Sequence, residues 1–257
     1  MEPKPVEHSR PPAYPTRREV LTGAASFALV SLTGCNFVVA EDPGGEISVA
    51  PIFERGEGRG ATGCIVVSPP VFLSEEEGVQ ILREELAKHG IHLKAGGTLK
   101  GVHIAARREK YEWVDKGNGE KEIKESIVEL PDKVKPLRLD GLDPDRRIAV
   151  KFVSRKGYFD LGGPLSSSTV QGYEFKDVAK QVAAVAKQQA QDSVFLGVFY
   201  EPSTRIPLVE LSDEGNQLDR KTTWKQREER CKEESEKLLR EQARDFVGWL
   251  KEQKAIQ

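Results

Sequence analysis

The sequence has few cysteines, histidines and methionines, and it has no strong excess of either charge. It contains three Cys, four His and one Met among 257 residues, with 39 Lys and Arg against 41 Asp and Glu. The two signs alternate along the chain, so there is no basic field of the kind that marks nucleic-acid binding and no acidic tail. The composition therefore argues against a nucleic-acid partner.

Common metal-site motifs are also missing. The sequence has no His-Glu-x-x-His and no paired Cys-x-x-Cys. Among the later histidines, His89 and His92 lie on either side of Gly90 at a predicted helix end, and His103 is further along the chain. This spacing does not place the histidines one helical turn apart, as shared ligation of a metal ion would need. The position of His89 is more simply explained by the favourable interaction of a histidine with the negative end of the helix dipole. We therefore expect no metal site, and the sequence leaves any cofactor undetermined.

One glycine-rich segment has the spelling of a dinucleotide-binding loop, Gly-x-Gly-x-x-Gly, from Gly58 to Gly63. That motif needs a strand before it and a helix after it. Here it is followed by the apolar run 64–67 and by Pro69 and Pro70, which is typical of a buried strand. We interpret the segment as a flexible lead-in to a core strand.

The clearest pattern in the chain runs from residue 16 to residue 35. Thr16-Arg17-Arg18-Glu19-Val20-Leu21 is followed by an uncharged run and then by Leu32-Thr33-Gly34-Cys35. This segment resembles the signal of a bacterial lipoprotein precursor exported by the twin-arginine pathway. The resemblance implies that Arg17 and Arg18 direct export, that residues 1–34 are cleaved, and that Cys35 is lipidated. The protein would then be anchored by lipid in the cell envelope, facing the periplasm or the exterior.

An uncleaved membrane helix is the competing interpretation of the same segment. The stretch from Val20 to Ala40 has no charge and is long enough to cross a bilayer. Its apolar character is only moderate, because it includes several Thr, Ser and Gly residues. We favour the cleaved signal, and in either case the following domain is tethered.

Two cysteines are left once Cys35 is assigned to lipid. In an oxidising compartment Cys64 and Cys231 are a candidate disulfide. Two separate buried thiols are the alternative, because Cys64 opens an apolar run. A reactive thiol at Cys64 is a third interpretation.

The chain after the signal divides into three parts. Residues 35–60 are expected to be the lipidated cysteine and a flexible tether with a short strand at 47–53, residues 61–215 an α+β domain, and residues 216–257 a long helix. The expected fold is a mostly antiparallel sheet with two packed helices on one face and the long C-terminal helix closing or extending it.

The expected elements come from periodicity and from end signals. The two packed helices are predicted over 74–88, opened by Ser74 and a capping-box Glu77, and over 174–191. Strands are predicted over 91–94, 99–106, 110–114, 123–130, 147–155 and 193–200, with a turn over 116–119.

The long helix is predicted to begin at Lys221 and to end at Lys254. Its second half has a broad apolar face that can dock on the domain, whereas its first half has only a narrow apolar stripe. This helix could offer a surface to a protein partner, and the alternative is a charged, solvated helix on its own domain.

The sequence does not name a reaction. It favours a membrane-anchored binding or interaction module, and the alternative is an exported enzyme or a cofactor- or metal-binding protein with a site near Gly58 to Cys64. A pocket could also form where strands end in aromatic pairs, Tyr158-Phe159 and Phe199-Tyr200, with Glu201 or Arg205 as polar members.

The anchor can be tested at Cys35. If Cys35 carries lipid, Cys35→Ala should release the domain from membranes, as measured by fractionation of membranes and soluble protein. Retention of the variant in the membrane would instead indicate an uncleaved helix.

Overall fold

The computed structural model describes residues 47–63, 70–117, 120–166, 168–205 and 224–257. The proposed signal residues Arg17 and Arg18, the lipidation site Cys35 and the alternative anchor segment 20–40 lie outside the described residues, as does Cys64. Within the described chain, no helix is both long and apolar enough to cross a membrane.

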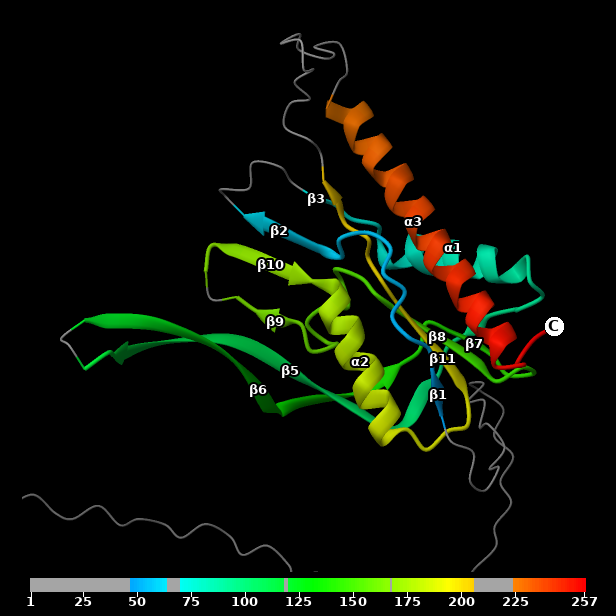
Figure 1. The fold of residues 1–257 in the computed structure, drawn as a ribbon, viewed down its shortest axis with the longest axis horizontal. Coiled ribbons are helices and arrows are strands. Elements are labelled where there is room, and N and C mark those ends of the chain that lie inside the picture. Colours follow the sequence, from blue (N-terminus) through cyan, green and yellow to red (C-terminus); the bar gives the residue numbers. More distant parts are fainter. Residues whose placement is uncertain (1–46, 64–69, 118–119, 167, 206–223) are drawn as a thin grey trace, which may run out of the picture. The chain divides into compact units, whose positions relative to one another are not determined.

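The main sheet has five strands in the order β1-β11-β8-β7-β4 (Figure 1). Their bounds are β1 Ser48–Val49, β4 Lys94–Ala95, β7 Gly141–Asp143, β8 Ile148–Val153 and β11 Phe195–Tyr200. The first three strands in that order run parallel, while β7 pairs antiparallel with both β8 and β4. The α+β class is therefore confirmed, but the sheet is mixed rather than mostly antiparallel. The reason is that β8 and β11 are joined by a helix, α2 (Phe175–Gln189), and such a crossover makes two strands parallel.

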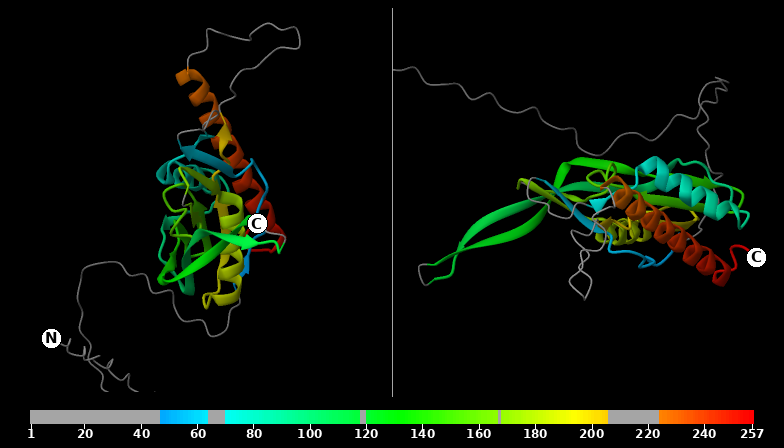
Figure 2. Two further views of the ribbon diagram at one scale, coloured as in Figure 1. Left: turned by 90° about the vertical axis from the view of Figure 1, so that its left-hand side faces the viewer. Right: turned by 90° about the horizontal axis from the view of Figure 1, so that it is seen from above.

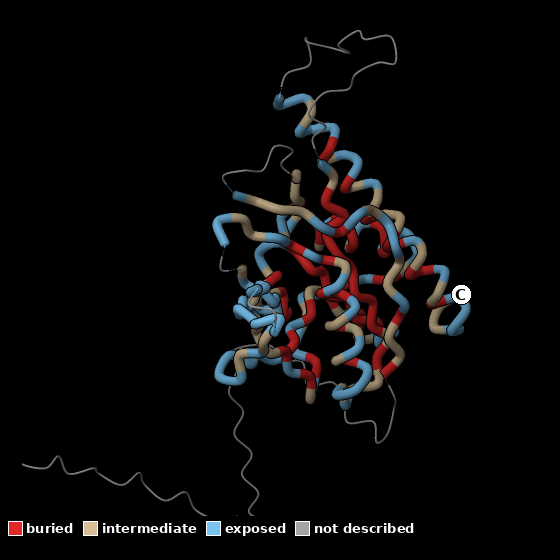
Figure 3. Tube along the Cα trace, turned by 60° about the vertical axis from the view of Figure 1, so that its left-hand side comes forward, coloured by how far each residue is buried: buried red, intermediate tan, exposed pale blue. Residues whose placement is uncertain are grey.

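The helices lie on both faces of this sheet, which corrects the expectation of two helices on one face. In β8, Ala149 and Val153 belong to the apolar cluster that contains α2. Val150 and Phe152 belong to a second cluster, formed with α1 (Glu75–Ala87) and α3 (Trp224–Glu252). Figure 3 shows the buried residues concentrated in the central strands and along the helix sides that face them. Successive side chains of β8 point to opposite faces of the sheet, so this one strand contributes to both apolar cores.

Local end signals place α1 as the sequence predicts. The Ser74 side chain accepts a hydrogen bond from the Glu77 N–H at 3.1 Å, and the Glu77 carboxylate accepts one from the Ser74 N–H at 2.9 Å. This reciprocal capping box satisfies two donors that a helix start otherwise leaves unpaired. The predicted helix over 174–191 and the strands over 147–155 and 193–200 are likewise confirmed as α2, β8 and β11.

The long C-terminal helix is confirmed as α3, and its two halves differ as expected. From Leu239 onward its buried apolar residues pack in the second core, including Phe246 and Leu250. In the first half only Cys231 and Ser235 are buried, and the Thr204 hydroxyl donates to the Cys231 carbonyl. The apolar stripe of α3 is therefore used inside the domain.

A buried carboxylate, Glu85, ties α1 to α3. It receives Lys88 Nζ at 2.6 Å and Arg244 Nε at 2.7 Å, and its side chain is 3% exposed. Burial acts to raise the pKa of Glu85, but the hydrogen bonds from Lys88 and Arg244 outweigh it and lower the pKa to about 2. The carboxylate is therefore ionised and paired at any physiological pH.

A long antiparallel hairpin replaces the short strands expected between residues 99 and 130. Its strands are β5 (Thr98–Asp115) and β6 (Lys121–Arg138), and β9 (Pro164–Leu165) pairs with β5 only at Arg107 and Arg108. The expected strands 99–106 and 110–114 are one strand, because no turn residue separates them. Figures 1 and 2 show the closed end of the hairpin extending away from the main sheet.

The segment expected to be a flexible tether is part of the folded domain from Ile47 onward. Ser48 and Val49 pair with β11, and Ile47 and Ala50 are buried. Two further two-stranded sheets pair β2 (Arg59–Gly63) with β10 (Val170–Glu174) and β3 (Pro70–Val71) with β12 (Thr204–Arg205). The expectation of a tether through residue 60 is therefore corrected for residues 47–60.

Two helical glycines make a matched test of this packing. A Cβ added at Gly78 of α1 would lie 2.2 Å from the buried ring of Phe152, whereas one added at Gly248 of α3 would meet nothing within 4 Å. We expect Gly78→Ala to lower the free energy of unfolding by about 1–3 kcal/mol through overpacking. Gly248→Ala should raise it by about 0.5–1 kcal/mol, because alanine favours the helix. Urea denaturation of both variants measures the contrast, and equal effects would contradict the close packing of α1 on β8.

Candidate functional site

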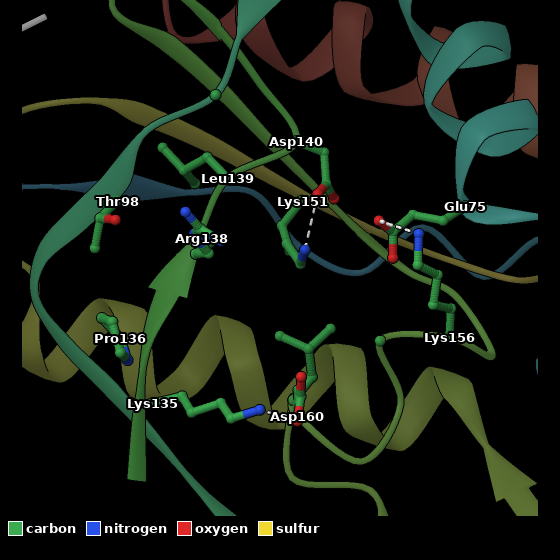
Figure 4. A pocket seen from close by; sticks show the side chains of 13 residues that line it. Glu75, Thr98, Lys135, Pro136, Arg138, Leu139, Asp140, Lys151, Lys156 and Asp160 are labelled. Carbon is green, nitrogen blue, oxygen red and sulfur yellow. Dashed lines mark hydrogen bonds and ion pairs between the residues drawn. The ribbon is translucent and has the colours of Figure 1, made fainter. Parts of the chain in front are cut away.

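A hollow of about 780 Å³ lies where the hairpin meets the main sheet (Figure 4). Its walls come from the start of β5, the end of β6, β8, the turn after β8 and the first residue of α1. The charged residues that line it are Glu75, Lys135, Arg138, Asp140, Lys151, Lys156 and Asp160. The volume is within the range of small-molecule sites, and the lining is unusually rich in charge.

Lys151 and Asp140 form a buried ion pair in the wall of this hollow. Lys151 lies within β8 and is 7% exposed, and its Nζ is 2.8 Å from Asp140 Oδ1. The other oxygen of Asp140 accepts the Phe152 N–H at 2.6 Å. Burial raises the pKa of Asp140, and Lys151 acts in the opposite direction. These contacts fix Asp140 onto β8. Lys151, which carries the ammonium group of the pair, also lines the hollow.

Two more lysines line the hollow, each paired near its rim. Lys135 contacts Asp160 at 2.6 Å, and Figure 4 shows this pair across the hollow from Lys151. Lys156 contacts Glu76 at 2.8 Å and Glu75 at 3.8 Å. These pairs are mostly exposed, so each adds little to stability. They can exchange partners with a ligand at low cost.

Arg138 differs from the three lysines. No carboxylate among the described residues pairs with its guanidinium, although it lines the same hollow. A guanidinium presents a planar set of donors that matches a carboxylate or a phosphate in bidentate fashion. The arrangement can therefore bind an anionic group at Arg138 and hydrogen-bond the rest of a polar molecule through the surrounding ion pairs.

A second hollow of about 520 Å³ shares Glu75 and Lys156 with the first. Here the Arg155 guanidinium lies 5.7 Å from the ring centroid of Phe72 and 5.9 Å from that of Tyr173. This hollow is lined by the aromatic residues Phe72, Phe159 and Tyr173 as well as by charged side chains. The first hollow is the stronger candidate because it combines an unpaired cation with a buried ion pair.

The glycine-rich segment does not form a phosphate loop. Residues 59–63 are β2, which pairs antiparallel with β10, and Gly58 has a left-handed φ of +64° beside the Tyr200 ring. Arg59 contacts Glu57 at 3.5 Å, on the surface. The interpretation against a dinucleotide site agrees with this geometry, although the segment is itself a strand rather than a flexible lead-in.

The three later histidines do not converge. His89, His92 and His103 are all exposed, and the described part of the chain contains no group of three or more His, Cys, Asp or Glu side chains arranged to hold a metal ion. The His92 N–H donates to Asp143, so the local role of this residue is in the backbone network.

Cys231 is buried on α3 and has no disulfide partner among the described residues. Burial raises its pKa, so the thiol is protonated at neutral pH. Its candidate partner, Cys64, lies outside the described residues, and the disulfide stays a prediction.

The aromatic pairs expected to line a pocket are mostly core residues. Tyr158 and Tyr200 pack in the first core and Phe199 in the second, while Phe159 alone is partly exposed. Glu201 follows β11 and is fully buried, accepting hydrogen bonds from the N–H groups of Leu73 and Ser203 at 2.9 and 3.0 Å. It stabilises the chain ends around β3 and β12.

The sequence interpretation missed every charged residue of the hollow. Only one of them left a signal: Lys151 interrupts an otherwise apolar strand, Ile-Ala-Val-Lys-Phe-Val. A strand buried on both faces has no solvent side for an ammonium, so Lys151 must meet a carboxylate. Comparisons with protein-family models, with curated proteins and with solved structures find no match.

Glu201 makes stability depend on pH. Burial raises the pKa of the Glu201 carboxyl to about 8. The hydrogen bonds from the N–H groups of Ser203 and Leu73 act in the opposite direction but are outweighed. The folded protein thus holds this proton over a range where the unfolded chain releases it, so stability falls as pH rises from about 5 to 8. The slope from this group is at most about 1.4 kcal/mol per pH unit.

Urea unfolding between pH 5 and pH 9 tests this prediction. Glu201→Gln should flatten the fall in unfolding free energy, even though the amide loses one hydrogen bond. Glu129→Gln is the control, because Glu129 is exposed and should leave the slope unchanged. Parallel slopes for wild type and Glu201→Gln would contradict the assignment.

Proposed function

We propose that this protein is a lipid-anchored envelope protein whose domain binds a small, polar, anionic ligand in the hollow beneath the hairpin. The pattern from Arg17 to Cys35 supports export and anchoring. The hollow supports binding, because it combines ligand-sized volume with charged walls.

The observation that carries the ligand proposal is the unpaired Arg138 guanidinium in the same hollow as the Lys151 ammonium. Each lysine of the hollow has a carboxylate partner, so the set without Arg138 is close to neutral. Arg138 adds one uncompensated cation, which an anionic ligand would neutralise. A carboxylate or phosphate group fits this chemistry, and hydroxyl groups on the same ligand suit the alternating Lys, Asp and Glu side chains.

The competing proposal is an exported enzyme or cofactor-binding protein with a site near residues 58–64. The twin-arginine route supports it, since that pathway suits proteins that fold before export. Residues 59–63 pair along their whole length with β10, however, and this leaves their backbone N–H groups less available to a ligand. The proposal of a binding module rests on stronger geometry.

A protein partner at the helix from Lys221 to Lys254 stays a proposal. The apolar stripe of α3 packs within the domain, so a partner would contact the charged outer side of the helix or Trp224, which is 55% exposed. Rim charges of this kind add specificity more than affinity.

A native intact mass of the protein extracted from its own membrane in mild detergent tests the anchor and the ligand together. A lipidated mass that begins at Cys35 supports the lipoprotein. An additional non-covalent mass that is lost in Arg138→Ala supports a ligand in the hollow. A bound mass that persists in Arg138→Ala would place the ligand elsewhere and favour the competing proposal.

Arg138 also allows a quantitative test. With citrate and inorganic phosphate as probes, calorimetry should show binding to the wild type that Arg138→Ala weakens about tenfold or more, because charge-assisted hydrogen bonds are lost. Arg108→Ala is the matched control, as Arg108 lies on the same hairpin outside the hollow. Equal loss of binding in both variants would indicate only general charge attraction and would contradict the site.

A further inference from the structure

The closed end of the hairpin is a two-stranded ribbon, and at its base the Tyr111 side chain is within hydrogen-bonding reach of Ser166. We call residues 109–115 of β5 and 121–127 of β6 the arm. The pairing of β5 with β9 ends at Arg108, and among the described residues the arm strands pair only with each other. Figures 1 and 2 show the arm away from the helices and the main sheet. A two-stranded ribbon alone is marginally stable in water, and it normally needs a third strand or a helix packed on one face. No described strand or helix covers the arm in this way (Figures 1 and 2).

The arm exposes four large apolar side chains on one face. Trp113 pairs directly with Ile123, and Tyr111 and Ile127 are on the neighbouring rungs of the same face, because opposite residues share a face and every second residue returns to it. Their exposed fractions are 69% for Trp113, 53% for Ile123, 44% for Tyr111 and 52% for Ile127. We call this surface the apolar face of the arm.

The apolar face is also the acidic face. Glu109, Glu125 and Asp115 share it, against one cation, Lys121. No lysine or arginine of the described chain forms an ion pair with Glu109 or Glu125, and the Tyr111 hydroxyl donates to Glu109 at 2.9 Å. The carboxylates near the apolar residues are thus available to an outside cation.

The opposite face of the arm has balanced charge. Lys110 and Lys124 lie there with Glu112 and Glu122, and Lys110 contacts Glu112 at 2.6 Å. Only the apolar face therefore has an excess of negative charge, and it is also the face that carries Tyr111 and Trp113.

We propose that the apolar face of the arm docks a partner polypeptide that presents large apolar side chains flanked by lysine or arginine. Charge complementarity selects this occupant. A second copy of the same face would bring Glu109 and Glu125 against like charges, and an anionic lipid surface would be repelled in the same way. A basic, apolar segment covers Trp113 and Ile123 and neutralises both carboxylates.

The partner gains most of its binding from the centre of this face. Trp and Tyr are the residues most often dominant in protein interfaces, especially where charged groups surround them and exclude water. Trp113 is the anchor, and Glu109 and Glu125 form the rim. This docking is independent of the ligand hollow, since Arg138 and Lys151 lie at the other end of the hairpin and on the main sheet.

The test uses the full chain in detergent and synthetic probes. One short peptide alternates leucine with lysine, and a second alternates leucine with glutamate. We expect the basic peptide to bind in a fluorescence anisotropy titration, and Trp113→Ser to weaken that binding about tenfold or more. The double variant Glu109→Gln with Glu125→Gln should weaken it severalfold, and the acidic peptide should bind poorly.

Matched variants on the opposite face control for stability and for net charge. Val114→Ser alters an apolar residue that is 43% exposed one position from Trp113, and Glu112→Gln with Glu122→Gln removes the same charge from the other face. Both should leave binding unchanged, and urea unfolding confirms that each variant is folded.

Four outcomes would overturn the proposal. Equal binding of the acidic peptide would refute charge selection, and equal weakening by the two double variants would refute the face assignment. Self-association that Trp113→Ser abolishes, or vesicle binding of phosphatidylglycerol that depends on Trp113, would identify a second copy or a lipid surface as the occupant instead.

Discussion

The parallel pairing of β8 with β11 is the constraint on which the rest of the structure depends. Both strands lie between two layers, because α2 covers one face and α1 with α3 covers the other. A strand buried on both faces is apolar along its length. Accordingly β11 has no charged side chain and β8 has one, Lys151. An ammonium in that position needs a carboxylate within reach, and Asp140 supplies it.

The position of the hollow follows from how the chain brings Asp140 to Lys151. Asp140 lies between the end of β6 and the start of β7, so the same segment that satisfies Lys151 also carries Lys135 and Arg138 to the hollow. A buried ion pair contributes little net stability compared with apolar packing, because two charges lose their hydration. The proposed ligand would give these two charges a second role at the hollow.

Local signals were readable from the sequence and non-local ones were not. Ser74 and Glu77 predict the start of α1 because both capping bonds lie within one turn. The parallel order of the main sheet depends on pairing between β8 and β11, which are joined through α2, and periodicity alone does not encode it. The length of the hairpin was also hidden, since Pro131 and Pro136 suggest a break. Pro136 is tolerated because β6 is an edge strand, and Pro131 because it lies in an irregularity where residues 131–133 have no partner on β5. Charged residues of the hollow look like any solvated surface until the fold gathers them, and Lys151 alone departed from that pattern.

Proteins usually bury apolar side chains and expose charged ones, and the hollow and the arm depart from this rule in opposite ways. In the hollow, buried charge is satisfied within the chain, whereas in the arm exposed apolar surface has no cover within the described chain. Fully burying a large apolar side chain is worth about 1.5–3 kcal/mol, but association costs at least several kcal/mol in lost freedom of motion. Four side chains at the arm would therefore give only modest affinity between freely diffusing molecules. An anchor at Cys35 changes this balance if the partner is held at the same membrane, because confinement raises the effective concentration without any new contact. The proposed anchor would thus strengthen binding at the proposed arm surface by raising the effective concentration of the partner.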